Sequence, residues 1–243
     1  MKANLLAQVA SFSLMSALKL LTYPFYRFEV NWLSRESSVE LDKVRLIVLL
    51  NHTSLYEALF VRLGPFRLLW RIAGQLMVPV ADITVKRPVV GRFFYTLLPG
   101  LTPISRKRDD SWQTFLERID QEAIVAILPE GRMRRRDGRD KFGKPMSVRA
   151  GVADIIETLE EGNILFVYSG GLHHVQIPGQ KFPRLFKRIK ANMELVDISD
   201  YKSQYASDDA RKRKLAYVAD IERRLEVNTP YCEQQPYNQK LSD

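Results

Sequence analysis

Short apolar runs alternate with amphipathic stretches along most of the chain. Buried strands, each a mostly apolar run rich in aliphatic residues, are expected at 44–50, 123–128 and 163–168. Shorter strands are expected at 68–73 and 100–105. Helices are expected at 54–63, 88–98, 110–121 and 150–161. They are recognised by apolar residues at helical spacing and by Gly or Pro near their ends. This alternation predicts an α/β fold, a single domain with a mostly buried central sheet flanked by helices.

The two ends of the chain differ from this central pattern. From residue 181 the sequence predicts a basic helix, a strand, a long charged helix over 206–227 and a polar tail. We therefore divide the chain into an N-terminal, membrane-associating helical segment (1–33), a core (34–190) and a C-terminal strand and helix extension with the tail (191–243).

The N-terminal segment is apolar but short. A run of about 16 helical residues spans roughly 24 Å, less than the ~30 Å hydrocarbon core of a bilayer. Asn4, Gln8, Ser11 and Lys19 fall on one side at helical spacing, which favours an amphipathic helix lying in the membrane surface. A helix that packs on the protein core is an equally open alternative.

Composition narrows the class of protein and its partners. With 46% hydrophobic and 27% charged residues, the chain is not intrinsically disordered, and its single cysteine excludes an internal disulfide or a cysteine-rich zinc module. The 37 Lys and Arg against 28 Asp and Glu give a net charge of +9. The basic residues gather at 132–149 and 181–190, so an anionic partner is expected: lipid, a phosphorylated ligand or nucleic acid.

Candidate chemistry begins with the three histidines of the chain. His52 follows a predicted strand, and Glu57 lies five residues later. Five residues turn a helix by about 140°, more than one face allows, so the two meet only if His52 lies on the loop and folds back. There Glu57 could orient the imidazole as a general base. Alternatively, Ser54 and Glu57 form a capping box and Glu57 is only structural. His173 and His174 lack a nearby acid in sequence and are weaker candidates.

Residues 51–57, Asn-His-Thr-Ser-Leu-Tyr-Glu, resemble the Asn-His-x4-Asp motif of the glycerolipid acyltransferases, the family that includes lysophosphatidic acid acyltransferase. Further segments resemble later blocks of that family and follow in its order: 88–91 with 100–106, 128–131 and 149–153. The resemblance covers about residues 44–180. It implies transfer of a fatty acyl group from a thioester of coenzyme A or acyl carrier protein to a hydroxyl of a lysophospholipid or related glycerolipid.

The resemblance also implies roles for individual residues. His52 would be the general base on the acceptor hydroxyl and Glu57 its orienting acid, with no metal and no bound cofactor. The residues expected to bind substrate are Asn51, Arg106, Glu130, Gly131, Arg132 and Arg134. The implied location is the cytoplasmic face of a membrane, peripheral or monotopic, with an anionic membrane surface, a lysolipid acceptor and an acyl donor as partners.

This sequence departs from the family's pattern at three places. Glu57 replaces the usual aspartate, and Arg-Met-Arg follows Gly131 where the family has Thr-Arg-Ser. A later segment, 166–170, lacks the family's usual proline. These departures leave the acceptor open and keep a second hypothesis, a catalytically silent lipid-binding or scaffold protein of the same fold. Nucleic acid is not expected as a partner, because no aromatic residues for stacking are interleaved within 132–141.

Overall fold

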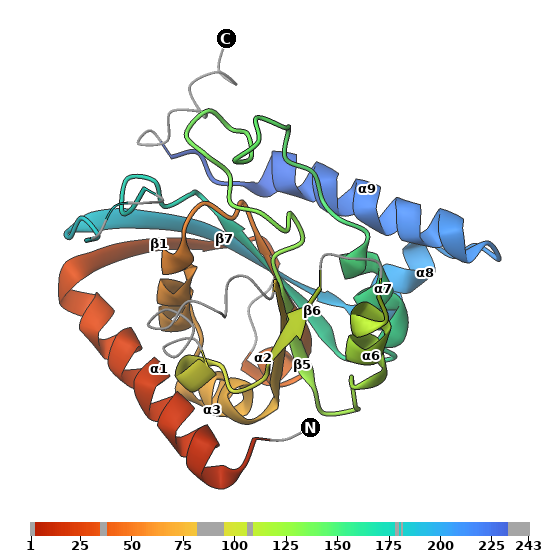
Figure 1. Cartoon of the computed structure of the whole chain (residues 1–243), viewed down its shortest axis with the longest axis horizontal. Coiled ribbons are helices and arrows are strands. Elements are labelled where there is room, and N and C mark those ends of the chain that lie inside the picture. The colour runs from red at the N-terminus through yellow and green to blue at the C-terminus, as the bar shows by residue number, and fades with distance from the viewer. Residues whose placement is uncertain are drawn as a thin grey trace.

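The computed structural model describes residues 3–34, 38–81, 95–105, 109–177, 180 and 182–232. Its centre is a seven-stranded sheet in the order β1-β7-β6-β2-β5-β3-β4 (Figure 1). The strands are β1 (Tyr26–Trp32), β2 (Val44–Leu50), β3 (Leu76–Ala81), β4 (Leu101–Ile104), β5 (Ile124–Ile127), β6 (Asn163–Ser169) and β7 (Lys187–Asp197). Strands β2 to β6 run parallel to one another, β7 runs antiparallel to β6, and β1 runs parallel to β7.

Helices cover both faces of this sheet, which confirms the predicted α/β class (Figure 1). On one side lie α1 (Leu5–Phe25), α2 (Ser38–Asp42), the 3-10 helix η1 (Leu55–Leu63) and α3 (Phe66–Gln75). On the other side lie α6 (Ser111–Glu117), α7 (Gly151–Thr158), α8 (Ile198–Gln204) and α9 (Ala210–Asn228). Successive residues of β2 pack against the helices on opposite faces of the sheet: Leu46 and Val48 pack with α7, whereas Ile47 packs with α3. A continuous aliphatic run is what a strand covered on both faces requires.

Two sequence-based assignments were wrong. The expected strand at 68–73 is part of helix α3, in which Leu68, Leu69 and Ala73 are buried at helical spacing; a short apolar run fits either structure. The basic helix expected from residue 181 is instead irregular chain at 182–186 followed by β7, whose buried residues Ile189 and Ala191 alternate with more exposed ones. Most of the helix expected at 88–98 lies outside the described residues.

Both ends of the chain contribute strands to the central sheet. Residues 26–32, expected within the N-terminal helical segment, form β1 and pair with β7 along their whole length. Strand β7 crosses the boundary expected at residue 190 and pairs with β6 over seven positions, from Asn163 to Ser169. The N-terminal helix α1 and the first C-terminal helix, α8, are therefore each joined directly to a strand of the same sheet.

Helix α1 packs on the protein through its polar side. The side chains of Gln8 and Ser11 donate hydrogen bonds to the carbonyls of Trp70 (3.1 Å) and Leu97 (2.6 Å). The ammonium of Lys19 donates to the carbonyls of Arg62 (2.6 Å) and Gly64 (2.9 Å), at the end of η1. The helix is docked on the core and still amphipathic, but its polar side faces the protein rather than water.

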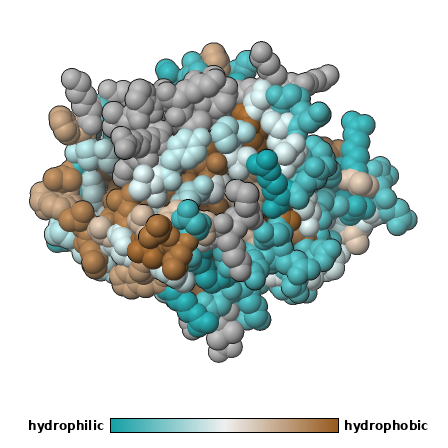
Figure 2. Space-filling model, turned by 60° about the horizontal axis from the view of Figure 1, so that its bottom comes forward, coloured by the Kyte–Doolittle hydropathy of each residue, from teal (hydrophilic) through white to brown (hydrophobic). Residues whose placement is uncertain are grey.

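The opposite side of α1 is apolar and faces outward. Its exposed large side chains are Leu5, Leu6, Val9, Leu20, Leu21 and Tyr23. With 21 residues the helix is longer than the sequence indicated and, by length and composition alone, could cross a membrane. Figure 2 shows hydrophobic side chains gathered on one side of the molecule and mostly hydrophilic ones on the other.

Candidate active site

The loop between β2 and η1 carries His52. At the end of β2, Asn51 adopts a left-handed conformation (φ 64°), and its side-chain amide donates to the carbonyl of Ser169 at the end of β6 (2.7 Å). Asparagine tolerates this conformation better than most residues. The buried Asn51 side chain therefore fixes the turn that carries His52 out of the sheet, and it serves the fold directly.

His52 and Glu57 are in contact. The Nδ1 atom of His52 lies 2.9 Å from Oε2 of Glu57. The other carboxylate oxygen, Oε1, accepts the backbone N–H groups of Thr53 (2.8 Å) and Ser54 (3.0 Å), and the hydroxyl of Ser54 accepts the N–H of Tyr56. One carboxylate therefore completes the capping box and orients the imidazole at the same time. The two interpretations of Glu57 are compatible, because each uses a different oxygen.

This environment changes the basicity of His52. Burial disfavours the imidazolium, but the negative charge of Glu57, its hydrogen bond and the more distant Glu130 outweigh burial, so the pKa of His52 is raised above its usual value of 6.5. A carboxylate at Nδ1 holds the proton on that nitrogen and leaves Nε2 as the basic one. The contact with Glu57 therefore fixes the orientation of the imidazole ring.

Glu130, in the turn after β5, holds the backbone of His52. Its Oε2 accepts the backbone N–H of His52 (2.6 Å), and its Oε1 lies 3.2 Å from Nη2 of Arg134. The backbone N–H of Arg134 in turn donates to the carbonyl of His52 (2.6 Å). Glu130 is 1% exposed, and burial raises its pKa despite the opposing effect of Arg134. Both residues were expected to bind substrate, but the contacts described here tie them to the chain itself.

A cavity of about 520 Å³ opens beside His52 and Glu57. Most of its wall is aliphatic or aromatic and comes from α1, the end of β1, β2, η1, α3, β3, β6 and β7. Examples of these wall residues are Met15, Trp32, Ile47, Leu68, Val78, Leu165 and Met193. Its polar lining comes from the β2–η1 loop, the first turn of η1 and the segment 131–141. A largely apolar cavity with a few polar groups at one end suits an elongated amphipathic ligand.

Three cations line the polar end of this cavity: Arg132, Arg135 and Lys141. Arg132 pairs with the buried Asp140 and lies over the ring of Phe142 (4.8 Å to the centroid). Hydrogen bonds to Asp140 from the Lys144 N–H and from Arg132 outweigh the effect of burial and lower the pKa of that carboxyl to about 2. Within the part of the chain that the structure describes, the side chains of Arg135 and Lys141 form no ion pair. The sequence predicted a basic cluster at 132–149 that contains both residues, but neither was among the residues expected to bind substrate.

The remaining predicted residues fall in several places. Gly131 lines the cavity with a left-handed backbone (φ 65°), the conformation that turns the chain after β5. Arg106 lies outside the described residues. The Nε2 atoms of His173 and His174 contact the carbonyls of Arg134 (2.8 Å) and Arg188 (2.7 Å), so both rings are buried structural groups.

Over the described ranges, no group of three or more His, Cys, Asp or Glu residues is arranged to hold a metal ion. The described site brings together an imidazole, a carboxylate in contact with it, an apolar cavity and a basic rim.

Of the comparisons with known proteins, the one with solved structures bears on the fold. No protein-family model matches the sequence, and no curated protein matches it. Among solved structures, the chain is similar to the 1-acyl-sn-glycerophosphate (LPA) acyltransferase PlsC from Thermotoga maritima, with a TM-score of 0.53 and 15% identity, over 91% of this chain and 80% of that one. The chain therefore has the fold of this 1-acyl-sn-glycerophosphate acyltransferase, as the sequence motifs led us to expect.

Proposed function

We propose that this protein transfers a fatty acyl group from a coenzyme A or acyl carrier protein thioester to a hydroxyl of a lysophospholipid or related glycerolipid. The contact between His52 and Glu57 beside an apolar cavity carries the proposal. Nε2 of His52 takes the proton of the acceptor hydroxyl as its oxygen attacks the thioester carbonyl. The C–S bond then breaks, and the imidazolium returns the proton to the leaving thiolate. Glu57 stabilises the imidazolium in between.

The cavity accounts for the other substrate features. Its aliphatic wall suits an acyl chain, since an apolar chain gains most by leaving water. Arg135 and Lys141, at its basic rim, suit a phosphate of the acceptor, because cationic donors form strong hydrogen bonds with phosphate oxygens. Arg132, which remains paired with Asp140, would add a third cationic group near this phosphate.

A direct assay tests this proposal. Membrane-bound protein is incubated with labelled acyl-coenzyme A or acyl carrier protein and a panel of lysolipids that differ in head group. Product with at least one donor and acceptor supports acyl transfer and identifies both. Absence of product with every pair, while lysolipid still binds, would favour the alternative function of a catalytically silent lipid-binding protein.

The raised pKa of His52 predicts the pH dependence of the reaction. The base must be neutral to accept a proton, so kcat/KM should fall as pH decreases through the folded-state pKa, which lies above 6.5. Glu57→Gln removes the charge that raises this pKa. The acidic limb of the pH profile of kcat/KM should therefore move to lower pH. A limb that stays in place in Glu57→Gln would assign it to a different group.

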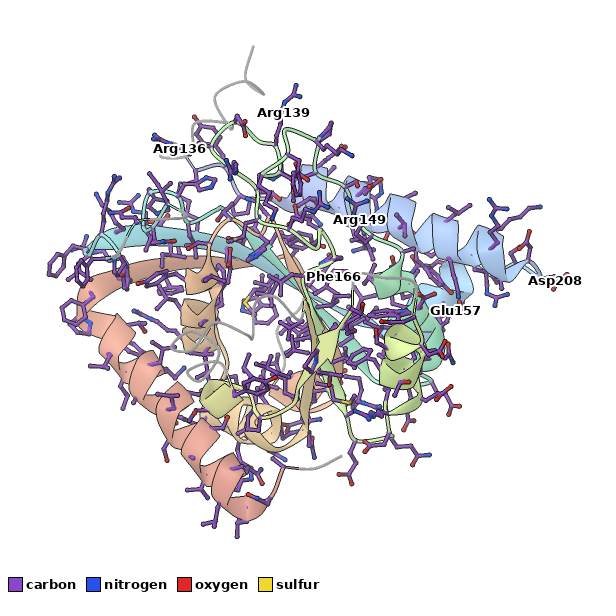
Figure 3. All side chains as sticks on the ribbon, in the orientation of Figure 1. Arg136, Arg139, Arg149, Glu157, Phe166 and Asp208 are labelled. Atoms are coloured by element: carbon purple, nitrogen blue, oxygen red, sulfur yellow. The ribbon has the colours of Figure 1, made fainter. Side chains whose placement is uncertain are left out.

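We expect Arg135→Ala and Lys141→Ala to raise KM for a phosphorylated acceptor by about tenfold or more, the loss of one charge-assisted hydrogen bond. Arg136→Ala is the matched control, because Arg136 lies in the same segment but projects outward at the top of the molecule (Figure 3). An acceptor without phosphate should respond to none of the three changes. A higher KM for the acyl donor instead would assign these cations to the donor.

The outward apolar side of α1 supports a membrane location (Figure 2). Because Gln8, Ser11 and Lys19 bond to the body of the protein, α1 would lie along the bilayer surface with its apolar side in the lipid. We propose peripheral or monotopic attachment at the cytoplasmic face of an anionic membrane.

A further inference from the structure

The chain between residues 182 and 186, which leads into β7, exposes a cluster of large apolar side chains. Phe182 is 78% exposed, Phe186 is 75% exposed, and Leu185 between them is 43% exposed. Isolated apolar side chains are normal on a protein surface. Three within five residues form a patch of the kind that marks an interaction site.

Phe186 is also held in an unfavourable backbone conformation. Its φ is 59°, in the left-handed region that suits glycine and is uncommon for a bulky residue. Its N–H donates to the carbonyl of Phe25 at the end of α1 (2.7 Å), and the two rings lie 5.9 Å apart. The backbone turn explains why a glycine would fit here. It does not explain an exposed phenyl ring, so a role for the ring outside the protein is indicated.

Cations lie next to these phenylalanines along the chain. Arg184 is exposed and Lys187 half-buried, and neither side chain has an acidic partner among the residues that the structure covers. Arg188 is paired with Glu29 across the β1–β7 ladder (3.0 Å). Aromatic rings flanked by unpaired cations match the interface of an anionic bilayer, where rings insert below the head groups and cations meet the phosphates.

The patch continues the apolar side of α1. Strand β7 begins where α1 ends, because Lys187 pairs with Tyr26, the residue after the helix (Figure 1). The exposed Leu20, Leu21 and Tyr23 lie on the last turns of α1, next to Phe25 and its partner Phe186. A bilayer that takes the apolar side of α1 therefore meets the 182–186 loop at the same end of the molecule.

We propose that residues 182–186 form a second membrane-contact element, in which Phe182 and Phe186 insert into an anionic lipid surface and Arg184 and Lys187 bind its head groups. The inference rests on the membrane location of the proposed function, but not on its chemistry. Together with α1 it would fix the orientation of the protein on the bilayer, which a single helix leaves free to rotate.

Sedimentation with phosphatidylcholine vesicles, with and without phosphatidylglycerol, tests the element on the full chain. The double variant Phe182→Ser, Phe186→Gly should bind anionic vesicles about tenfold or more weakly, since two rings leave the lipid. Its thermal unfolding midpoint should be unchanged or raised, because glycine relieves the backbone at residue 186. Arg184→Ser with Lys187→Ser should lose about fivefold per cation, on the anionic vesicles only.

Leu215→Ser is the control, because Leu215 is 60% exposed on α9, on the other side of the sheet. It should bind vesicles like the wild type. Equal binding by the Phe double variant and the wild type would overturn this inference alone and leave α1 as the attachment. Failure of the wild type to bind either vesicle would overturn it together with the proposed location. Loss of transfer to a detergent-dispersed acceptor in the double variant would instead assign the loop to the active site.

Discussion

Replacing His52 with alanine is expected to lower acyl transfer by about 10²- to 10⁴-fold, the usual contribution of a general base. The fold should survive, because the backbone of His52, not its ring, bonds to Glu130 and Arg134. Glu57 also keeps its two N–H donors. Initial rates of the variant and the wild type, measured beside their thermal unfolding, check this. A folded His52→Ala protein that transfers at the full rate would exclude the base.

Two changes at Glu57 separate its roles. Glu57→Gln keeps an oxygen for the N–H groups of Thr53 and Ser54 but places an uncharged amide at Nδ1 of His52. It should lower kcat by at least about tenfold and leave stability nearly unchanged. Glu57→Ala also removes the helix cap, which should lower the free energy of unfolding by about 1–2 kcal/mol. Equal kcat in Glu57→Gln and the wild type would mean that Glu57 serves only the helix.

The parts of the fold that the sequence predicted correctly depend on local patterns. The runs that became β2, β5 and β6 are mostly apolar and rich in Val and Ile, as expected of strands covered on both faces. The contact between His52 and Glu57 was also within reach, since both belong to one loop and the first turn of one helix. Short-range geometry limits the number of arrangements such a pair can adopt.

What the sequence missed depends on contacts between distant segments. Glu130 bonds the backbone of a residue 78 positions away, and no spacing rule connects the two. The orientation of α1 was unpredictable for the same reason. Gln8 and Lys19 look like a water-facing stripe until their partners are known, and those partners are backbone carbonyls beyond residue 60. The pairing of β1 with β7 joins the two ends of the chain.

The largest effect on stability is expected at Arg224, on α9. Its guanidinium bonds Asp220 (2.6 Å) and Glu194 on β7 (2.7 Å), and it lies over the ring of Phe166 (5.4 Å). Arg224 is 12% exposed and Asp220 3% exposed at the side chain. Removing one member of a buried ionic network leaves the others charged without compensation, so Arg224→Ala should destabilise by about 3–5 kcal/mol. In a protein of this size the midpoint should fall by roughly 6–20 °C.

Arg223 provides the matched control. It bonds the same carboxylate (2.6 Å) from a side chain that is 61% exposed, so water can replace it, and Arg223→Ala should cost less than about 1 kcal/mol. Chemical denaturation of both variants measures the difference. If the two variants lose the same free energy of unfolding, the network stabilises the protein through its number of charges and not through their burial. A large loss for Arg224→Ala alone would show that α9 is held to the sheet by a buried charge, and that the C-terminal helices stabilise the same sheet that positions His52.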